Sequence, residues 1–350
     1  MLLFYCRAGF EADCAAEVTA AALGAGADGR CEHEPNQAYV LWLPARRGSG
    51  SQLAWKPRLA ELVLARQWID RLRRVENLHA PDRVTPLVET AKHCGDGFSC
   101  VWIEAPDSEP GRKILGSARH LSDPLESALR DAHLLVSGRR GARLHVCFIE
   151  AQTALLGVSD PRLSSPWPMG IPRLKAPAGA PSRSGMKLVE ALATFVGDAA
   201  MLSRLRAGRV AVDLGASPGG WSQVLASRGM RVIAVDNGPI AGEVLHTQMV
   251  EHIRTDAFRF RPERPVDWMV CDVVAAPARI AALAAQWIAR GWCRETIFNL
   301  KLPTASRWQE IVRCRNVIER ALAQVSGQHE LRVKHLYHDR EEVTAHLRRL

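Results

Sequence analysis

The sequence has no stretch long and apolar enough to cross a membrane as a helix, which takes about 20 mostly apolar residues. Its most apolar region, residues 266–288, is interrupted by Asp267, Asp272 and Arg279. The N-terminus lacks the basic segment and long apolar core of a secretory signal. We therefore expect a cytoplasmic protein with no membrane partner.

Two sequence motifs are also missing. The nine cysteines are odd in number, scattered and never spaced as C-x-x-C, which favours reduced thiols over a disulfide framework or a structural metal site. The dinucleotide fingerprint G-x-G-x-x-G is absent, because Gly215 is followed by Ala216, Ser217 and Pro218 before the next glycine. A nicotinamide dehydrogenase is therefore a remote alternative.

Basic residues, by contrast, are in excess. The formal net charge is +9, which favours an anionic partner such as nucleic acid, although an arginine-rich composition alone does not decide the point. The length of 350 residues suggests about two domains, and the 47% hydrophobic content fits a globular protein.

The first 160 residues predict two small domains in which strands and helices alternate. In residues 1–80 we expect strands at 2–6 and 38–43 and helices at 10–23 and about 57–74, although 65–72 could be extended. In residues 81–160 we expect a strand at 98–104, a helix at 125–136 and a hairpin across 143–158. Short alternating pieces of this kind fit small α+β sandwiches.

Residues 161–184 differ in composition from their surroundings. Six prolines and several serines and glycines predict a linker or an extended arm. Its basic residues, Arg162, Arg173, Lys175 and Arg183, either contact phosphate or are simply solvated.

Residues 185–350 predict a parallel α/β sheet with right-handed crossovers. We expect helices at 186–196, 220–226, 278–290 and 308–325, and strands at 210–214, 232–236, about 252–255, 268–273 and 296–301. The last two segments, 331–337 and 343–350, are joined by a polar turn and predict an antiparallel pair.

The most informative stretch runs from residue 213 to residue 236. An apolar strand leads into a glycine-rich loop, and Pro218 is placed to open the following helix, where a missing N–H has no cost. A second apolar strand ends in Asp236, about 20 residues beyond the loop, where a carboxylate can bind both ribose hydroxyls. The stretch therefore predicts a nucleoside site in a βαβ unit.

Several motifs carry a resemblance to known families. The loop D-x-G-x-x-P-G-G at 213–220 resembles that of S-adenosylmethionine-dependent methyltransferases. The segments 182–188, 271–272, 299–303 and 339–343 follow with a spacing similar to that of the Lys-Asp-Lys-Glu tetrad of FtsJ-like ribose 2′-O-methyltransferases. The likeness to the bacterial RlmM-type 23S rRNA cytidine ribose methyltransferases covers nearly the whole chain and rests on segments 6–11, 65–68, 168–175, 291–301 and 336–343.

This resemblance implies a fold and a set of partners. It implies a Rossmann-like, seven-stranded methyltransferase domain at 185–350, a linker at 161–184, a THUMP-like RNA-binding domain at 81–160 and a ferredoxin-like domain at 1–80. The implied cofactor is S-adenosyl-L-methionine, and the implied partner is 23S rRNA, either naked or in a pre-ribosomal particle. The residues leave the oligomeric state open, with a monomer expected.

The cofactor residues are expected at the carboxyl ends of the parallel strands, where open α/β sheets bind ligands. The glycine loop would hold the methionine part, Asp236 the ribose and Asp256 the adenine amino group, unless Asp256 is only a solvated loop acid. By resemblance Ser184 also lies near the cofactor, and Asp272 near the reacting methyl group. The full expected set is Ser184, Asp213, Gly215, Ser217, Pro218, Gly219, Gly220, Asp236, Asp256 and Asp272.

The tetrad resemblance assigns the catalytic roles. A ribose hydroxyl needs a base to become nucleophilic, and we expect Lys301 to be that base, with Lys187 either as its electrostatic partner or as the group that positions the hydroxyl. Asp272 would link the lysines to the reacting methyl group, and Glu342, which directly precedes a valine as in the family, would orient Lys301. Glu341 is its rival. From sequence, Asp272 has a helix cap near residue 276 as its alternative role.

Other readings stay open. An RNA base methyltransferase could use Cys271, but the preceding proline of such enzymes is Val270 here, and Cys271 should face the core because neighbouring strand residues point to opposite faces. A non-catalytic RNA-binding assembly factor is a second alternative. Tyr337, His338 and Arg340 either contact RNA or form a hairpin turn, and Trp68 and Trp167 either stack on bases or pack in a core.

Overall fold

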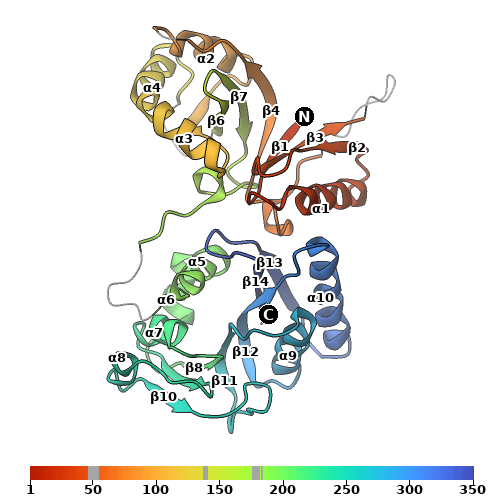
Figure 1. The fold of residues 1–350 in the computed structure, drawn as a ribbon, viewed down its shortest axis with the longest axis vertical. Coiled ribbons are helices and arrows are strands. Elements are labelled where there is room, and N and C mark those ends of the chain that lie inside the picture. Colours follow the sequence, from red (N-terminus) through yellow and green to blue (C-terminus); the bar gives the residue numbers. More distant parts are fainter. Residues whose placement is uncertain (46–54, 80, 137–140, 176–181, 183) are drawn as a thin grey trace. The chain divides into compact units, whose positions relative to one another are not determined.

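The computed structural model describes residues 1–45, 55–79, 81–136, 141–175, 182 and 184–350. The chain forms two compact units, Met1–Pro172 and Arg173–Leu350 (Figure 1). Each unit is built around one seven-stranded sheet, so the molecule has a mixed α/β fold.

The sheet of the first unit has the order β2-β3-β1-β4-β7-β6-β5. Its strands are β1 Leu2–Tyr5, β2 Gly29–Glu32, β3 Tyr39–Pro44, β4 Gln67–Val75, β5 Phe98–Glu104, β6 Ala142–Glu150 and β7 Thr153–Ser159. Its helices are α1 Glu11–Gly24, α2 Val84–Ala91, α3 Glu109–Ala118 and α4 Ser122–Asp131, with short 3-10 turns η1 Leu59–Glu61, η2 Arg119–Leu121 and η3 Pro168–Gly170.

Strand β4 replaces the second half of the helix expected at 57–74 and confirms the alternative that residues 65–72 are partly extended. It pairs with β1 on one side and with β7 on the other, and its register with β7 shifts between Asp70 and Arg73. This bulge places the buried side chains of Ile69, Leu72 and Val75 three residues apart, which is the spacing of a helix face rather than of a strand. The sequence pattern is therefore helical, whereas only the short turn η1 is a helix.

The strand and the hairpin expected in residues 81–160 are present as β5 and the pair β6–β7, but two helices there, α2 and α3, were not predicted. Helix α3 begins after Ser108, whose hydroxyl accepts a hydrogen bond from Gly111 N, a capping contact typical of helix starts. The helices α2, α3 and α4 cover the sheet around a core that includes Leu87, Leu125 and Phe148.

The first part of the expected linker packs on the first unit. The backbone carbonyl of Leu163 accepts the indole N–H of Trp68, and the carbonyl of Ser165 accepts the side-chain amide of Gln67. Met169 N donates to the carboxylate of Glu104. This stretch is therefore an arm held against β4 and β5, and Arg183 lies outside the described residues.

The sheet of the second unit has the order β10-β9-β8-β11-β12-β14-β13 (Figure 1). Its strands are β8 Val210–Leu214, β9 Arg231–Val235, β10 Val250–Ile253, β11 Val266–Cys271, β12 Cys293–Lys301, β13 His329–Lys334 and β14 Glu342–Arg349. Its helices are α5 Gly185–Phe195, α6 Asp198–Arg204, α7 Gly220–Ala226, α8 Gly242–Leu245, α9 Pro277–Ala289 and α10 Arg307–Leu322.

Every strand expected in residues 185–350 is present, and the closing pair β13–β14 is antiparallel as predicted. Helices α5 and α7 lie on one side of the sheet, and α9 and α10 lie on the other (Figure 1). Trp268 and Ile297 are buried between the layers. The short helices α6 and α8 were not predicted.

Membrane spans and metal clusters are both absent from the described residues. No helix in this part of the chain is both long and apolar enough to cross a membrane. Within the same residues, no group of three or more histidine, cysteine, aspartate or glutamate side chains is arranged to hold a metal ion.

Candidate active site

The glycine loop follows β8 and leads into α7. Gly215 has φ +80°, and a Cβ there would lie 2.6 Å from Cγ2 of Val273, so only glycine fits this turn. Gly219 is the N-cap of α7 and has φ +112°. Pro218 lies one residue before this cap, so the expectation that it opens the helix is wrong, because α7 begins at Gly220.

Asp236 closes β9 and holds the loop in place. One carboxylate oxygen accepts Ser217 N at 3.0 Å, and the other accepts Gly238 N at 2.7 Å. The side chain is only partly buried, so its remaining lone pairs can accept from the hydroxyls of a ribose. The structure thus brings the acid and the glycine loop together.

Asp213 lies beneath the loop and is almost fully buried. Its carboxyl accepts the hydroxyl of Ser222 at 2.7 Å. Burial raises the pKa of Asp213 to about 7, and the nearby carboxylates of Asp272 and Asp236 act in the same direction. Its visible role is therefore to fix the start of α7, and direct contact with the cofactor stays a prediction.

Asp256 and Ser184 occupy different settings. Asp256 is exposed and accepts the backbone N–H of Phe258 at 2.7 Å, so it forms a turn beyond β10. Ser184 is the N-cap of α5; its hydroxyl lies 2.5 Å from that of Ser182, and its carbonyl accepts the indole N–H of Trp221. Helix α5 is thereby attached to α7 beside the loop.

The four tetrad residues meet in one alternating ring of charges. Lys301 Nζ lies 2.5 Å from Asp272 Oδ1 and also contacts Glu342. Lys187 Nζ lies 3.4 Å from Asp272 Oδ2 and also contacts Glu342. Each ammonium group therefore contacts both carboxylates. Strand register explains part of this ring, because Lys301 on β12 lies opposite Glu342 on β14.

The ring is partly open to solvent. The side chains of Lys301 and Lys187 are 25% and 17% exposed, and that of Glu342 is 6% exposed. Glu341, the rival for the last position, pairs with Arg307 outside the ring. The geometry thus places Glu342, rather than Glu341, against both lysines.

The charge state of Lys301 follows from its neighbours. Burial acts to lower the pKa of Lys301, but the carboxylates of Asp272 and Glu342 outweigh it and raise the pKa above the ordinary value. Lys301 is therefore an ammonium group in the ring as it stands, and it must lose a proton before it can act as a base.

Sequence reasoning missed three polar residues next to the ring. Asn299 donates from its side-chain amide to Asp272 Oδ1 at 3.0 Å, and Thr344 contacts both Asn299 and Asp339. All three are fully buried. Asn299 and Asp339 lie within motifs already singled out, but it is the pairing of β12 with β14 that places Asn299 opposite Thr344, and a hydrogen bond that adds Asp339.

The turn between β13 and β14 is fixed by another missed residue. The buried carboxylate of Glu190 on α5 accepts from the backbone N–H groups of Tyr337 and His338 and lies 2.6 Å from His338 Nδ1. These contacts account for the hairpin-turn role of the two residues. A contact between them and RNA stays a prediction.

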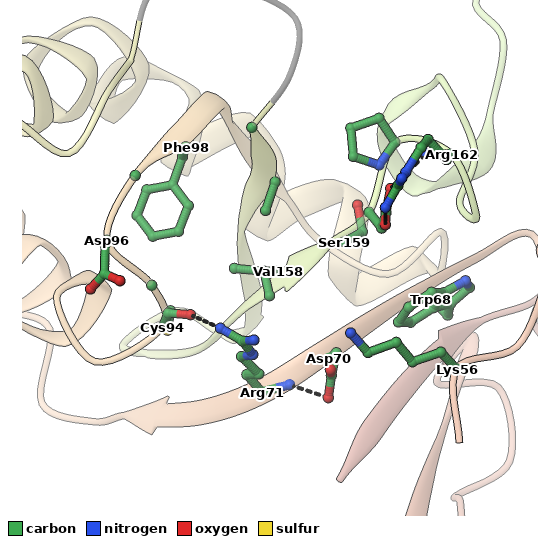
Figure 2. Close-up of a pocket in the computed structure, with 16 residues that line it drawn as sticks. Lys56, Trp68, Asp70, Arg71, Cys94, Asp96, Phe98, Val158, Ser159 and Arg162 are labelled. Carbon is green, nitrogen blue, oxygen red and sulfur yellow. Dashed lines mark hydrogen bonds and ion pairs between the residues drawn. The ribbon is translucent and has the colours of Figure 1, made fainter. Parts of the chain in front are cut away.

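A separate pocket of about 640 Å³ lies in the first unit (Figure 2). The β4 bulge, where Arg71 has φ +56°, aims the Arg71 guanidinium at the carbonyl of Cys94, 3.2 Å away. Among the described acids, none forms an ion pair with Arg71 or Lys56. The side chain of Arg162 is 86% exposed, and its guanidinium donates two hydrogen bonds to the carboxylate of Asp160. Trp68 also lines the pocket but is buried, so the core role fits it.

The chain resembles known proteins along nearly its whole length. Residues 180–342 match the FtsJ-like methyltransferase family, residues 1–69 the RlmM ferredoxin-like domain, and residues 82–160 the N-terminal domain of ribosomal RNA large subunit methyltransferase M. Ribosomal RNA large subunit methyltransferase M of Thauera aminoaromatica is 48% identical over 99% of this chain and 95% of its own length.

The chain is also similar to two further proteins. The protein of the same name from Methylococcus capsulatus is 44% identical over 99% of this chain and 97% of its own length. A solved structure of Aeropyrum pernix fibrillarin with natively bound S-adenosyl-L-methionine has a TM-score of 0.34 and 16% identity, over 60% of this chain and 84% of its own.

The fold and the loop at the carboxyl ends of its strands define an S-adenosylmethionine-dependent methyltransferase with a Rossmann-like catalytic domain and a ferredoxin-like N-terminal domain. More particularly, the chain belongs to the ribosomal RNA large subunit methyltransferase M family. The donor set suits this cofactor, since the acids Asp236, Asp256 and Asp272 follow β9, β10 and β11, where a cationic ligand that carries a ribose needs carboxylates.

Proposed function

We propose that the protein methylates the ribose 2′-hydroxyl of a cytidine in 23S rRNA, in the cytoplasm. The observation that carries the proposal is the ring in which Lys301 contacts Asp272 and Glu342 at the end of β12, with Lys187 on the opposite side. The names of the relatives, which are rRNA large subunit methyltransferases, support the choice of RNA.

The ring has the charges that this chemistry needs. Bound S-adenosylmethionine supplies an electrophilic methyl group on a positively charged sulfur. The two lysines and two carboxylates of the ring are neutral together, so the loss of one proton would give the ring a net charge of −1, which would favour a cationic cofactor. This loss would convert Lys301 into an amine that could accept the proton of the 2′-hydroxyl.

The other ring members have supporting roles. Asp272 contacts both lysines and holds Lys301 from the side of β11, while Glu342 holds it from β14. Lys187 keeps a positive charge beside the carboxylates after Lys301 has lost its proton, which lowers the pKa of Lys301 relative to a site without it.

The acceptor atom can be tested directly. An RNA in which only the target nucleotide is 2′-deoxy should bind but receive no methyl group, because the base is unchanged and the nucleophile is gone. Lys301→Ala should lose turnover yet keep cofactor binding. The wild-type product should resist alkaline cleavage at the modified position. Efficient methylation of the deoxy RNA would overturn the ribose mechanism.

The two alternative functions predict different properties of the protein. A base methyltransferase that used Cys271 would need a reactive thiolate, whereas burial raises the pKa of this thiol to about 12. A non-catalytic assembly factor would transfer no methyl group even at stoichiometric concentrations. Measuring methyl transfer to rRNA with an excess of protein over RNA separates this alternative from an enzyme.

We further propose that the first unit supplies affinity for RNA. Its pocket is lined by Lys56 and Arg71, neither of which forms a close ion pair with an acid among the described residues, and by the exposed guanidinium of Arg162 (Figure 2). Such groups suit a phosphate and an unpaired base, respectively.

The double variant Lys56→Ala/Arg71→Ala should weaken RNA binding and flatten its salt dependence by about one unit of slope for each phosphate group that the variant no longer binds. Lys113→Ala, which removes an exposed lysine paired with Glu109 on α3, is the matched control. Equal RNA affinity and salt dependence for the double variant and the control would remove the pocket from the RNA surface.

A further inference from the structure

A buried line of polar side chains leads from the β13–β14 turn to the charged ring. Asp339 contacts the hydroxyl of Thr344 through both oxygens at 3.0 Å, Thr344 lies 2.8 Å from Asn299 Oδ1, and Asn299 Nδ2 lies 3.0 Å from Asp272. Asn299 and Thr344 are direct partners across β12 and β14, two residues from Lys301 and Glu342. The line and the ring therefore share one face of the sheet.

The direction of each hydrogen bond follows from the group at the Asp272 end of the line. Asp272 contacts two ammonium groups as a carboxylate and can only accept, so Asn299 must turn its NH₂ group toward it. The amide oxygen of Asn299 then faces Thr344 and needs a donor. Thr344 has one hydroxyl proton, which this bond uses, so Thr344 can only accept from Asp339.

We propose that Asp339 is a neutral carboxylic acid that donates to Thr344, and that Asp339, Thr344 and Asn299 are positioning residues that fix Asp272 in the catalytic ring. The role in catalysis rests on the proposed function, whereas the protonation of Asp339 rests on the hydrogen-bond directions alone.

The surroundings of Asp339 favour the neutral form. Burial raises the pKa of Asp339 well above its ordinary range, and the carboxylates of Glu342 and Glu190 act in the same direction. The backbone N–H of Leu336 donates to Asp339 Oδ2 at 3.0 Å. Both carboxyl oxygens of Asp339 lie 3.0 Å from Thr344 Oγ1, within reach of a donated proton.

Substitutions test the direction of the hydrogen bonds in this line. Asp339→Asn keeps the pattern, because its NH₂ can donate to Thr344 and its carbonyl can accept from Leu336, so we expect turnover within about threefold of wild type. Thr344→Val should lower turnover about tenfold, the effect of one lost hydrogen bond near a charge, while Thr344→Ser restores it. Thr296→Val, which removes a buried hydroxyl on β12 that contacts the sulfur of Met269, is the matched control.

Two readouts separate positioning from simple destabilisation. Thr344→Val should shift the pH profile of turnover to lower pH, because a less firmly held Asp272 raises the pKa of Lys301 less, while cofactor affinity stays unchanged. An unshifted pH profile, or an Asp339→Asn variant that folds but is as slow as Thr344→Val, would overturn the proposed line of hydrogen bonds.

Infrared difference spectroscopy tests the protonation without any activity. Wild type minus Asp339→Asn at pH 7 should show the carbonyl band of a protonated carboxylic acid, and a carboxylate band instead would overturn the inference. A wild-type protein that shows this band but transfers no methyl group to ribose would overturn the proposed function and leave the protonation of Asp339 in place.

Discussion

The buried acid beneath the cofactor loop makes the stability of the second unit depend on pH. The pKa of Asp213 rises from 3.8 in an exposed setting to about 7 in the folded protein. The folded state therefore binds more protons than the unfolded state between these values, so the free energy of unfolding falls as the pH rises from about 4 to about 7. The full effect is about 4 kcal/mol as an order of magnitude.

The substitution Asp213→Asn removes this dependence. An asparagine keeps a carbonyl that can accept the hydroxyl of Ser222 but has no charge to bury. We expect the variant to be more stable than wild type at pH 8 and close to it at pH 4.5. Urea unfolding of the whole chain at both pH values measures the difference, and the transition of the second unit is the one that moves when S-adenosylmethionine is added.

A second acid of the same sheet provides the control. Asp267 on β11 pairs with Arg209 and accepts Val210 N, so Asp267→Asn should lose stability at pH 8 instead of gaining it. If the free energy of unfolding falls equally for Asp213→Asn and wild type between pH 4.5 and pH 8, ionisation of the buried Asp213 carboxyl is not the cause of the fall.

Three further predictions concern the same domain. Gly215→Ala should lower the melting temperature, because its Cβ would lie 2.6 Å from Val273, whereas Gly242→Ala, whose Cβ meets no atom within 4 Å, should not; equal melting temperatures contradict the steric argument. Asp236→Ala should weaken cofactor binding by about 1–3 kcal/mol in calorimetry, and unchanged affinity removes it from the site. Single-turnover methyl transfer should speed up between pH 7 and pH 10 as Lys301 loses its proton, and a flat profile argues against a lysine base.

The catalytic domain was predictable because its patterns are local. Strand β8 and helix α7 have the expected bounds, since an apolar run ends at a glycine loop that no regular element can continue through. In the β4 segment the helix was wrong and the extended alternative for 65–72 was right, for an equally local reason: the bulge at Arg71 gives a strand the spacing of a helix. A sequence does not show a bulge, because the extra residue is recognised only against its partner strand.

The candidate site was predictable only in part. Motif order identified Lys187 and Lys301 as members of one tetrad, although no periodicity relates residues so far apart. The positions of Asn299 and Thr344 beside it depend on the register of β12 against β14, which is settled by packing across the whole sheet. Residues that act through a register, rather than through a motif, are therefore the ones that sequence reasoning misses.

Strand β4 belongs to two modules at once, since one edge completes the ferredoxin-like sheet beside β1 and the other continues beside β7. The boundary between the two modules therefore runs along a strand and not through a linker. Neither module can be exchanged for a homologous piece without cutting a strand that both share.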